Sequence, residues 1–147
     1  MPRVYRSMLE EAGQPKIERS ANGLGVRIDG ESADVGVQAD GSLKAGKEGM
    51  SVAPLSKFLP RFRVYRGLEH IVEGAKSPNA NLRIWCMGEG PFQREIAAPD
   101  LMLIPDPPIE GVVKHGVMAP ERDMPITDYE AALANTQAQW IIDEARS

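Results

Sequence analysis

Glycine and proline interrupt this chain so often that long helices and long strands have little room. The 147 residues include 14 glycines and 12 prolines, about 18 per cent of the chain against about 12 per cent in an average protein. Proline cannot continue a helix, and glycine weakens helices and strands alike. We therefore expect one domain, residues 1–147, built from short elements joined by many turns. No apolar run approaches the roughly 20 residues of a membrane-spanning helix.

Charge and cysteine content narrow the class of protein. The chain has 17 basic and 21 acidic residues, which gives a formal net charge of −4. Nucleic-acid-binding domains are usually basic because phosphate neutralisation supplies much of their affinity, so nucleic acid is a disfavoured partner. Cys86 is the single cysteine and cannot form an internal disulfide. The N-terminal residues lack the apolar segment of a secretory signal, which predicts a cytoplasmic protein in the producing cell.

Alternating and apolar runs predict several short strands. Asp29-Gly30 and Asp40-Gly41 are turn dipeptides, so residues 24–46 are expected to form a glycine-punctuated hairpin. An apolar run at 82–87 is the strongest strand candidate. The proline cluster at 105–108 predicts an exposed turn after a second apolar run. Further strands are expected at 4–6, 33–38, 62–66, 101–104 and within 111–118.

The C-terminal segment predicts a helix over residues 127–143. Thr127 and Glu130 have the spacing of a capping box, in which both side chains satisfy free backbone N–H groups. Apolar and small residues then follow at helical spacing and predict one buried stripe, made of Tyr129, Leu133, Thr136 and Trp140. Short strands with one helix indicate an α+β fold, with Trp85 and Trp140 as core anchors.

The strong motifs of common enzyme classes are absent. One cysteine and two distant histidines offer no zinc-ligand spacing, so no metal is expected. No Walker-type loop is present, and Gly23-Leu24-Gly25 lacks the third glycine of a dinucleotide fingerprint. No Gly-x-Ser-x-Gly elbow occurs either. These absences disfavour the commonest NTPase, Rossmann and hydrolase interpretations.

Three weaker candidates for a ligand site remain, each with a purely structural alternative. Ser51 follows Gly49 and Met50 at the end of a short apolar run; its hydroxyl either bonds a ligand ribose or satisfies a turn. His115 beside Gly116 has room for a ligand and a pKa range near neutrality, or is a loop histidine. Arg6 either forks onto a phosphate or carboxylate or protects a sheet edge. His70 has no supporting neighbours and is interpreted as a surface residue.

Taken in order, short motifs along nearly the whole chain resemble one known family. These small bacterial toxins are grouped with the second type VI secretion exported effector of Pseudomonas and have an ADP-ribosyltransferase-like fold. The resemblance is carried by order and spacing, and it is weakest over residues 61–84. The matching segments are Val4-Tyr5-Arg6, Gly23-Leu24-Gly25-Val26-Arg27, Asp34-Val35-Gly36-Val37, Asp40-Gly41, Gly49-Met50-Ser51-Val52-Ala53-Pro54, Leu59-Pro60, Trp85, Pro105-Asp106-Pro107, His115-Gly116-Val117, Met124, Asp128-Tyr129-Glu130-Ala131-Ala132-Leu133, Thr136 and Trp140.

The resemblance implies two small, mostly antiparallel sheets around an NAD-binding cleft, with a C-terminal helix. It implies that Arg6, Leu24 and Ser51 bind NAD, the substrate. Ser51 and His115 are the implied catalytic residues. The family's superfamily also uses a late glutamate to stabilise positive charge on the ribose, and Glu121 is the nearest acid after the His-Gly segment.

The implied function is that of an antibacterial toxin delivered by the type VI secretion apparatus into the cytoplasm of a competing bacterium. A cognate immunity protein would protect the producer. Two alternatives stay open. One is a ribonuclease-like toxin that uses His115 with Lys114 or Arg122 for acid–base chemistry. The other is a non-catalytic module that binds a partner protein, for which the proline-rich 105–108 loop is available.

Overall fold

The computed structural model describes residues 1–30, 33–59 and 82–144. The strand predicted at 62–66 and the surface position predicted for His70 lie outside these residues. The described part is mixed α+β, with antiparallel strand pairing in every ladder and a helix near the C-terminus, as expected. No helix among the described residues is long and apolar enough to cross a membrane.

Two four-stranded sheets and a two-stranded ladder make up the β structure of the described residues. The first sheet has the order β10-β5-β1-β2: β10 (Ile141–Ile142), β5 (Leu82–Met87), β1 (Val4–Glu11) and β2 (Gln14–Pro15). The second has the order β4-β8-β7-β6: β4 (Met50–Val52), β8 (Gly116–Pro120), β7 (Leu101–Pro105) and β6 (Glu95–Ala98). The ladder pairs β3 (Ser42–Leu43) with β9 (Met124–Pro125).

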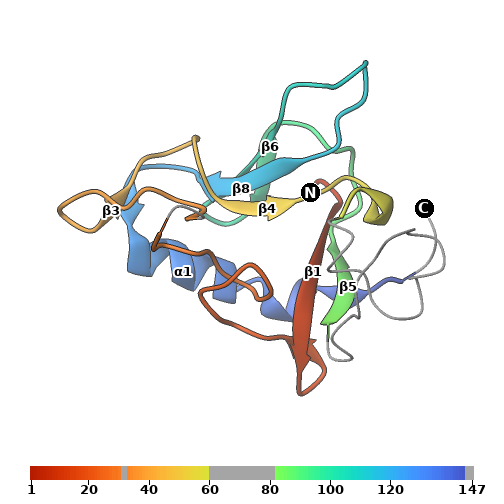
Figure 1. Ribbon diagram of the computed structural model, residues 1–147, viewed down its shortest axis with the longest axis horizontal. Helices are drawn as coiled ribbons and strands as arrows, with labels where there is room; N and C mark the ends of the chain where they lie inside the picture. Colours follow the sequence, from red (N-terminus) through yellow and green to blue (C-terminus); the bar gives the residue numbers. More distant parts are fainter. Residues whose placement is uncertain (31–32, 60–81, 145–147) are drawn as a thin grey trace.

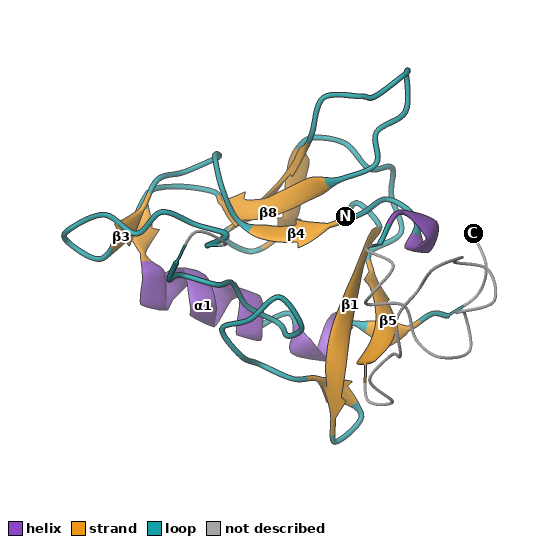
Figure 2. Cartoon of the chain, viewed as in Figure 1, coloured by secondary structure: helices purple, strands orange, loops and turns teal. Residues whose placement is uncertain are grey.

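The helix α1 (Ile126–Ala134) lies along one side of the molecule, and the two larger sheets are set at a steep angle to each other (Figure 1). Short 3-10 turns occur at Ser56–Phe58 and Gln137–Gln139. Loops and turns connect nearly every pair of elements (Figure 2), which agrees with the density of glycine and proline. The main core cluster contains Trp85 and Trp140, 1 % and 4 % exposed, so both tryptophans are the predicted core anchors.

The predictions for the apolar strands are confirmed. Residues 82–87 form β5, which pairs along its whole length with β1. The run at 101–104 forms β7, and the following residues 106–108 are exposed as predicted. Buried strands of this kind are recognisable because both faces are apolar and glycine or proline marks each end.

The predicted hairpin over residues 24–46 is wrong. In its described residues only Ser42–Leu43 forms a strand, and that strand pairs with β9 instead of a hairpin partner. Arg27 and Asp34 are instead hydrogen-bonded to each other. The Asp34 amide donates to the Arg27 carbonyl (2.8 Å), and the Arg27 amide donates to the Asp34 carboxylate (2.7 Å). The alternating pattern correctly indicated that Val26 and Val35 are buried. The Asp34 side chain, however, accepts from the Arg27 amide, which in a hairpin would have bonded to a neighbouring strand.

The helix is shorter than predicted, although its buried stripe is correct. The α-helix ends at Ala134, yet Tyr129, Leu133, Thr136 and Trp140 are all between 0 % and 4 % exposed. Thr136 Oγ1 donates to the Leu133 carbonyl (2.7 Å) and accepts from Trp140 Nε1 (2.9 Å). These bonds hold the turn that follows the helix and direct the chain into β10.

The predicted capping box does not form. The residue before the helix is Pro125, and no side chain caps the helix there. Glu130 instead accepts hydrogen bonds from Arg19 Nε (2.5 Å) and Nη2 (2.8 Å). A long-range arginine fork is a stronger partner for a carboxylate than a single backbone N–H, which explains the difference.

Tyr129 ties the helix to the second sheet beside residue 51. Its hydroxyl accepts from the Met50 amide (2.9 Å) and donates to the Met118 carbonyl (2.5 Å). Burial raises the pKa of this phenol, so it stays protonated and keeps both bonds. Gly49 lies at the same junction, and a Cβ there would come within 2.1 Å of the Met118 carbonyl oxygen. A glycine at position 49 is therefore required by the close approach of this segment to Met118 of β8.

We expect Tyr129→Phe to lower the free energy of unfolding by about 1–3 kcal/mol, because two buried backbone groups lose their partner. Urea unfolding followed by circular dichroism measures the change. Tyr5→Phe is the matched control, since the Tyr5 hydroxyl donates across a longer distance, 3.4 Å, to Asp143 Oδ2. Equal losses for the two variants would contradict the role given to Tyr129.

Candidate functional site

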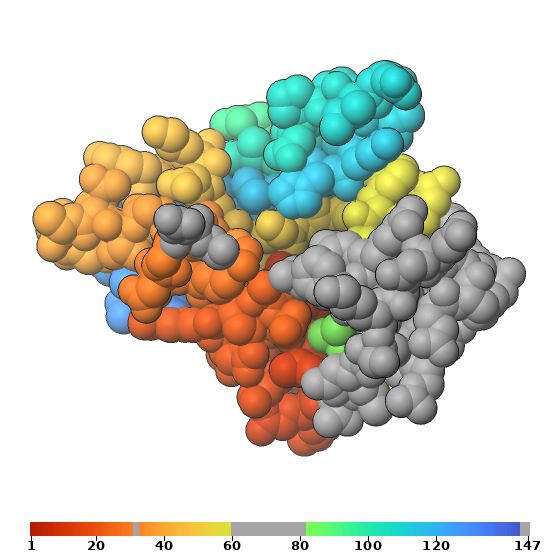
Figure 3. All heavy atoms as spheres, viewed as in Figure 1, coloured from red at the N-terminus to blue at the C-terminus, as the bar shows by residue number. Residues whose placement is uncertain are grey.

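A pocket of about 240 Å³ opens where the two large sheets meet. The sheets are joined there by Tyr5 and Ala53, whose backbones exchange two hydrogen bonds of 2.8 and 2.9 Å. In the space-filling view, the yellow residues that follow β4 adjoin the blue residues of β8 (Figure 3). The described lining comprises three basic side chains, Arg6, Arg27 and His115, two serines, Ser7 and Ser51, and an apolar wall of Val52, Ala53, Phe58 and Leu59.

Strand register brings three of the predicted site residues to this one pocket. Arg6 follows Tyr5 on β1, so it lies one residue beyond the junction with Ala53. On β4, Ser51 pairs with Val117 and Val52 pairs with Gly116 of β8. His115 immediately precedes Gly116 and therefore enters the pocket beside the end of β4. Arg6, Ser51 and His115 come from segments far apart in the sequence, and all three line the pocket.

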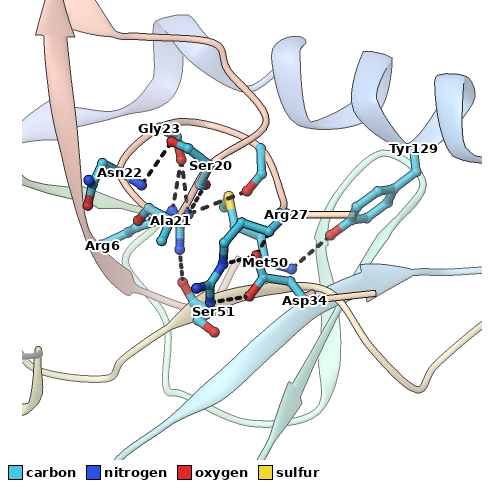
Figure 4. Close-up of polar contacts among 11 residues, drawn as sticks. Arg6, Ser20, Ala21, Asn22, Gly23, Arg27, Asp34, Met50, Ser51 and Tyr129 are labelled. Atoms are coloured by element: carbon cyan, nitrogen blue, oxygen red, sulfur yellow. Dashed lines mark hydrogen bonds and ion pairs between the residues drawn. The ribbon is translucent and has the colours of Figure 1, made fainter. Parts of the chain in front are cut away.

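Arg6 is 4 % exposed and binds the backbone around the pocket. Its Nε and Nη2 donate to the Gly23 carbonyl (3.1 and 3.0 Å), and its Nη1 donates to the Ser51 carbonyl (2.8 Å). Figure 4 shows the guanidinium between the Ser20–Gly23 loop and Ser51. Arg6 therefore holds a loop and a strand in place, and it adds a positive charge to the wall of the pocket.

His115 is paired with Asp106, a residue that the sequence analysis did not select. The His115 Nδ1 and Asp106 Oδ2 atoms are 2.6 Å apart, and the Asp106 amide donates to the His115 carbonyl (2.8 Å). When Nδ1–H donates to a carboxylate, the neutral imidazole carries its lone pair on Nε2, which can then accept a proton. Both side chains are about half exposed, 44 % for His115 and 50 % for Asp106.

The His115–Asp106 pair follows from a β-hairpin. Pro105 pairs with Gly116 where β7 and β8 leave the sheet, so residues 106 and 115 face each other across the hairpin. The intervening chain closes through reciprocal hydrogen bonds between Ile109 and Val112. This segment, drawn in teal to light blue, projects from the body of the molecule (Figure 1). A hairpin prediction for 101–120 would have placed an aspartate opposite the histidine.

Arg27 is the second site residue that the sequence analysis missed. Its Nη2 and Nε face the Asp34 carboxylate, at 3.1 Å from Oδ1 and 3.4 Å from Oδ2 (Figure 4). The hydrogen bond to Asp34 raises the pKa of the guanidinium, so the side chain is charged at every physiological pH. The signal in the sequence was the pair Arg27 and Asp34 on either side of the Asp29-Gly30 turn.

Two predicted residues lie elsewhere. Leu24 is 1 % exposed and packs into the main core, so its side chain does not reach the pocket. Glu121 is exposed and follows the last residue of β8, whereas His115 precedes the first. The Glu121 amide donates to the Asp100 carbonyl (2.9 Å) at that far end. We therefore leave Leu24 and Glu121 out of the candidate site, whose described lining contains no carboxylate.

Two lysine side chains contact the ring of Phe58 in the apolar wall. The Nζ atoms of Lys57 and Lys114 lie 5.4 and 5.9 Å from the centroid of the Phe58 ring. An aromatic face attracts cations, and the two lysines already occupy that role, so the wall suits a flat, apolar ligand group. Arg122, proposed with His115 in the ribonuclease alternative, instead contacts Asp100 at 2.5 Å beyond the far end of β8.

Comparison with known proteins adds no relative. No protein-family model matches the chain, and no curated protein is significantly similar to it. Within the described residues, no group of three or more histidine, cysteine or acidic side chains is placed to hold a metal ion. The functional argument therefore depends on the pocket and its lining.

Proposed function

We propose that this chain is an NAD-binding toxin with an ADP-ribosyltransferase-like fold, which transfers ADP-ribose or cleaves NAD in the cytoplasm of target bacteria. One observation carries the proposal: Arg6, Ser51 and His115, the residues implied by resemblance to the type VI secreted toxins, line a single pocket between two antiparallel sheets. On this proposal the protein is delivered by a type VI secretion apparatus, and a cognate immunity protein protects the producing cell.

The size and lining of the pocket favour one end of NAD. Sites that enclose a whole drug-sized ligand measure about 300–1,000 Å³, so a pocket of about 240 Å³ suits the nicotinamide and its ribose. The nicotinamide ring is flat, and Phe58, Leu59 and Val52 form an apolar wall of the pocket against which a flat ring can pack. Ser51 supplies a hydroxyl for the ribose, while the rest of the dinucleotide extends across the open side.

The chemistry breaks the bond between the nicotinamide nitrogen and ribose C1′. The electron pair of that bond leaves with nicotinamide, and positive charge develops on the sugar. An acceptor hydroxyl or a water molecule then attacks C1′ and gives up its proton. His115 Nε2 is the base available in the described lining, and Asp106 keeps the imidazole in the tautomer that can accept this proton. Phe58 and Leu59 exclude water from the apolar side.

Calorimetric titration of NAD into the purified protein tests the binding step. We expect saturable binding with one site per chain, and we expect Ser51→Trp, which places a large side chain at a partly exposed position of the lining, to weaken it at least tenfold. Ile96→Trp is the control, because Ile96 is an exposed residue of β6 outside the pocket lining. Failure of the folded wild-type protein to bind NAD at millimolar concentration would reject the proposal.

Expression inside bacteria separates the proposed activity from its alternatives. We expect growth arrest with the wild-type chain, loss of arrest with His115→Ala, and a fall in cellular NAD before growth stops if NAD is cleaved. Growth arrest that persists with folded His115→Ala and Ser51→Ala would instead favour a partner-binding module.

A ribonuclease-like toxin is the second candidate function. The His115–Asp106 pair next to Lys114 favours it, because an oriented histidine beside a cation suits attack on phosphodiesters. Degraded cellular RNA with unchanged NAD would support this candidate, and intact RNA during growth arrest would reject it.

A further inference from the structure

The residue expected to bind an anion, Arg6, is engaged in holding the chain together. Each of its three nitrogens donates to a backbone carbonyl, from Gly23 or Ser51. Moving the guanidinium toward a ligand would break bonds that fix both a loop and β4. Arg6 therefore contributes positive charge to the pocket, but its N–H groups are held by the backbone and cannot turn toward a ligand.

Arg27 has a different arrangement in the same pocket. Asp34 occupies one edge of its guanidinium, formed by Nε and Nη2. Within the described part of the chain, Nη1 makes no hydrogen bond. The side chain is 38 % exposed and lines the pocket, so a donor edge with its charge is accessible to a ligand.

The position of Arg27 is fixed before any ligand arrives. The preceding residue, Val26, is fully buried in the core, and the Arg27 amide donates to Asp34 Oδ2 (2.7 Å). Asp34 is itself held, with a side chain only 11 % exposed. A side chain that is already ordered loses little conformational entropy on binding, which makes it an efficient anchor for a ligand.

We propose that Arg27, held at one edge by Asp34, binds a phosphoryl group of the ligand in this pocket. Guanidinium groups bind phosphate oxygens through directed N–H donors, and a second positive charge nearby strengthens the attraction. Arg6 supplies that second charge. For the dinucleotide this assignment rests on the proposed function, and the group bound is then its diphosphate. The subsite itself requires only a ligand that carries phosphoryl groups.

Titration with three probes tests the assignment: inorganic pyrophosphate, ADP-ribose and nicotinamide riboside, which lacks phosphate. We expect Arg27→Gln to weaken pyrophosphate and ADP-ribose binding by about 10- to 100-fold, the usual effect of losing a charge-assisted hydrogen bond. Nicotinamide riboside binding should change less than twofold. Arg27→Lys keeps the charge but loses the fork to Asp34, so we expect an intermediate loss.

Arg122→Gln is the matched control, because it removes the same charge at the exposed far end of β8. It should leave all three affinities unchanged, and thermal melts should show that every variant is folded. Equal weakening of nicotinamide riboside and ADP-ribose by Arg27→Gln would show a merely structural role and overturn the proposal. Equal pyrophosphate affinities in the two glutamine variants, or none in the wild type, would also overturn it.

The same probes distinguish this proposal from the proposed function. Arg27-dependent binding of pyrophosphate without binding of nicotinamide riboside or NAD would keep the phosphoryl subsite and reject the NAD site. Binding of nicotinamide riboside and NAD, with pyrophosphate binding that does not depend on Arg27, would keep the NAD site and reject the phosphoryl subsite. Tighter binding of ADP-ribose than of inorganic pyrophosphate would identify the phosphoryl group as part of a nucleotide, while equal affinities would identify free pyrophosphate as the ligand.

Discussion

Replacing Arg6 with methionine is expected to lower the free energy of unfolding by about 3–5 kcal/mol, the largest stability loss predicted for this chain. The guanidinium is 4 % exposed and satisfies the Gly23 and Ser51 carbonyls. Methionine fills part of the volume but offers no donor, so these buried acceptors lose their partner. Chemical denaturation monitored by circular dichroism measures the loss.

Two further variants show that the effect comes from the buried fork. Arg3→Met removes the same group from an exposed position, where Arg3 Nε makes a single 3.3 Å bond to the Gly88 carbonyl. We expect a loss of less than about 1 kcal/mol there. Arg6→Lys retains the charge but replaces the fork with one ammonium group, so it should recover only part of the stability. A loss at Arg6 no greater than that at Arg3 would refute this account.

Replacing His115 with alanine is expected to lower kcat/KM for NAD cleavage by about 10²- to 10⁴-fold, the range for loss of a general base. NAD binding should weaken far less, because the contribution of the base is made in the transition state. Nicotinamide release measured by chromatography gives the rate, and calorimetry gives the affinity. A His115→Ala enzyme with the wild-type rate would show that the proton goes elsewhere.

Asp106→Asn tests the positioning role of the carboxylate on His115. We expect a smaller loss of kcat/KM than for His115→Ala, since the half-exposed Asp106 orients the base without touching the substrate. Nitrogen-15 NMR should show the Nδ1–H tautomer of His115 in the wild type and a mixture of tautomers in the variant. Glu110→Gln removes a carboxylate from the same exposed loop and should change neither result. A tautomer unaffected by Asp106→Asn would remove Asp106 from the mechanism.

Local patterns predicted much of the fold where burial alone defined the element. The apolar run at 82–87 became β5, and the helical stripe from Tyr129 to Trp140 is buried throughout. The same patterns did not predict secondary structure correctly where it depended on which group the backbone bonds to. Val26 and Val35 are buried as their alternation indicated, but the neighbouring residues Arg27 and Asp34 bond to each other and not to a paired strand. A pattern of burial does not say which group will satisfy the intervening backbone.

The residues of the candidate site also fall into those that the sequence predicted and those that depend on tertiary contacts. Arg6, Ser51 and His115 could be selected from residue type and neighbouring glycines, and all three line the pocket. Asp106 and Arg27 were missed because each acquires its role from a partner across a turn. Leu24 and Glu121 were selected by position along the chain, and packing places the first in the core and the second at the wrong end of β8.

Glycine and proline spacing determined from the sequence that this chain would fold into short elements with many turns, and apolar spacing determined which faces are buried. Those properties depend on backbone freedom and on side-chain hydrophobicity, which each residue carries with it. Tertiary structure alone decided that Arg6 would bind carbonyls, that His115 would meet Asp106, and that Arg27 would keep a donor toward the pocket. Hydrogen-bond partners are chosen by strand register and packing between distant segments, and no residue carries that information by itself.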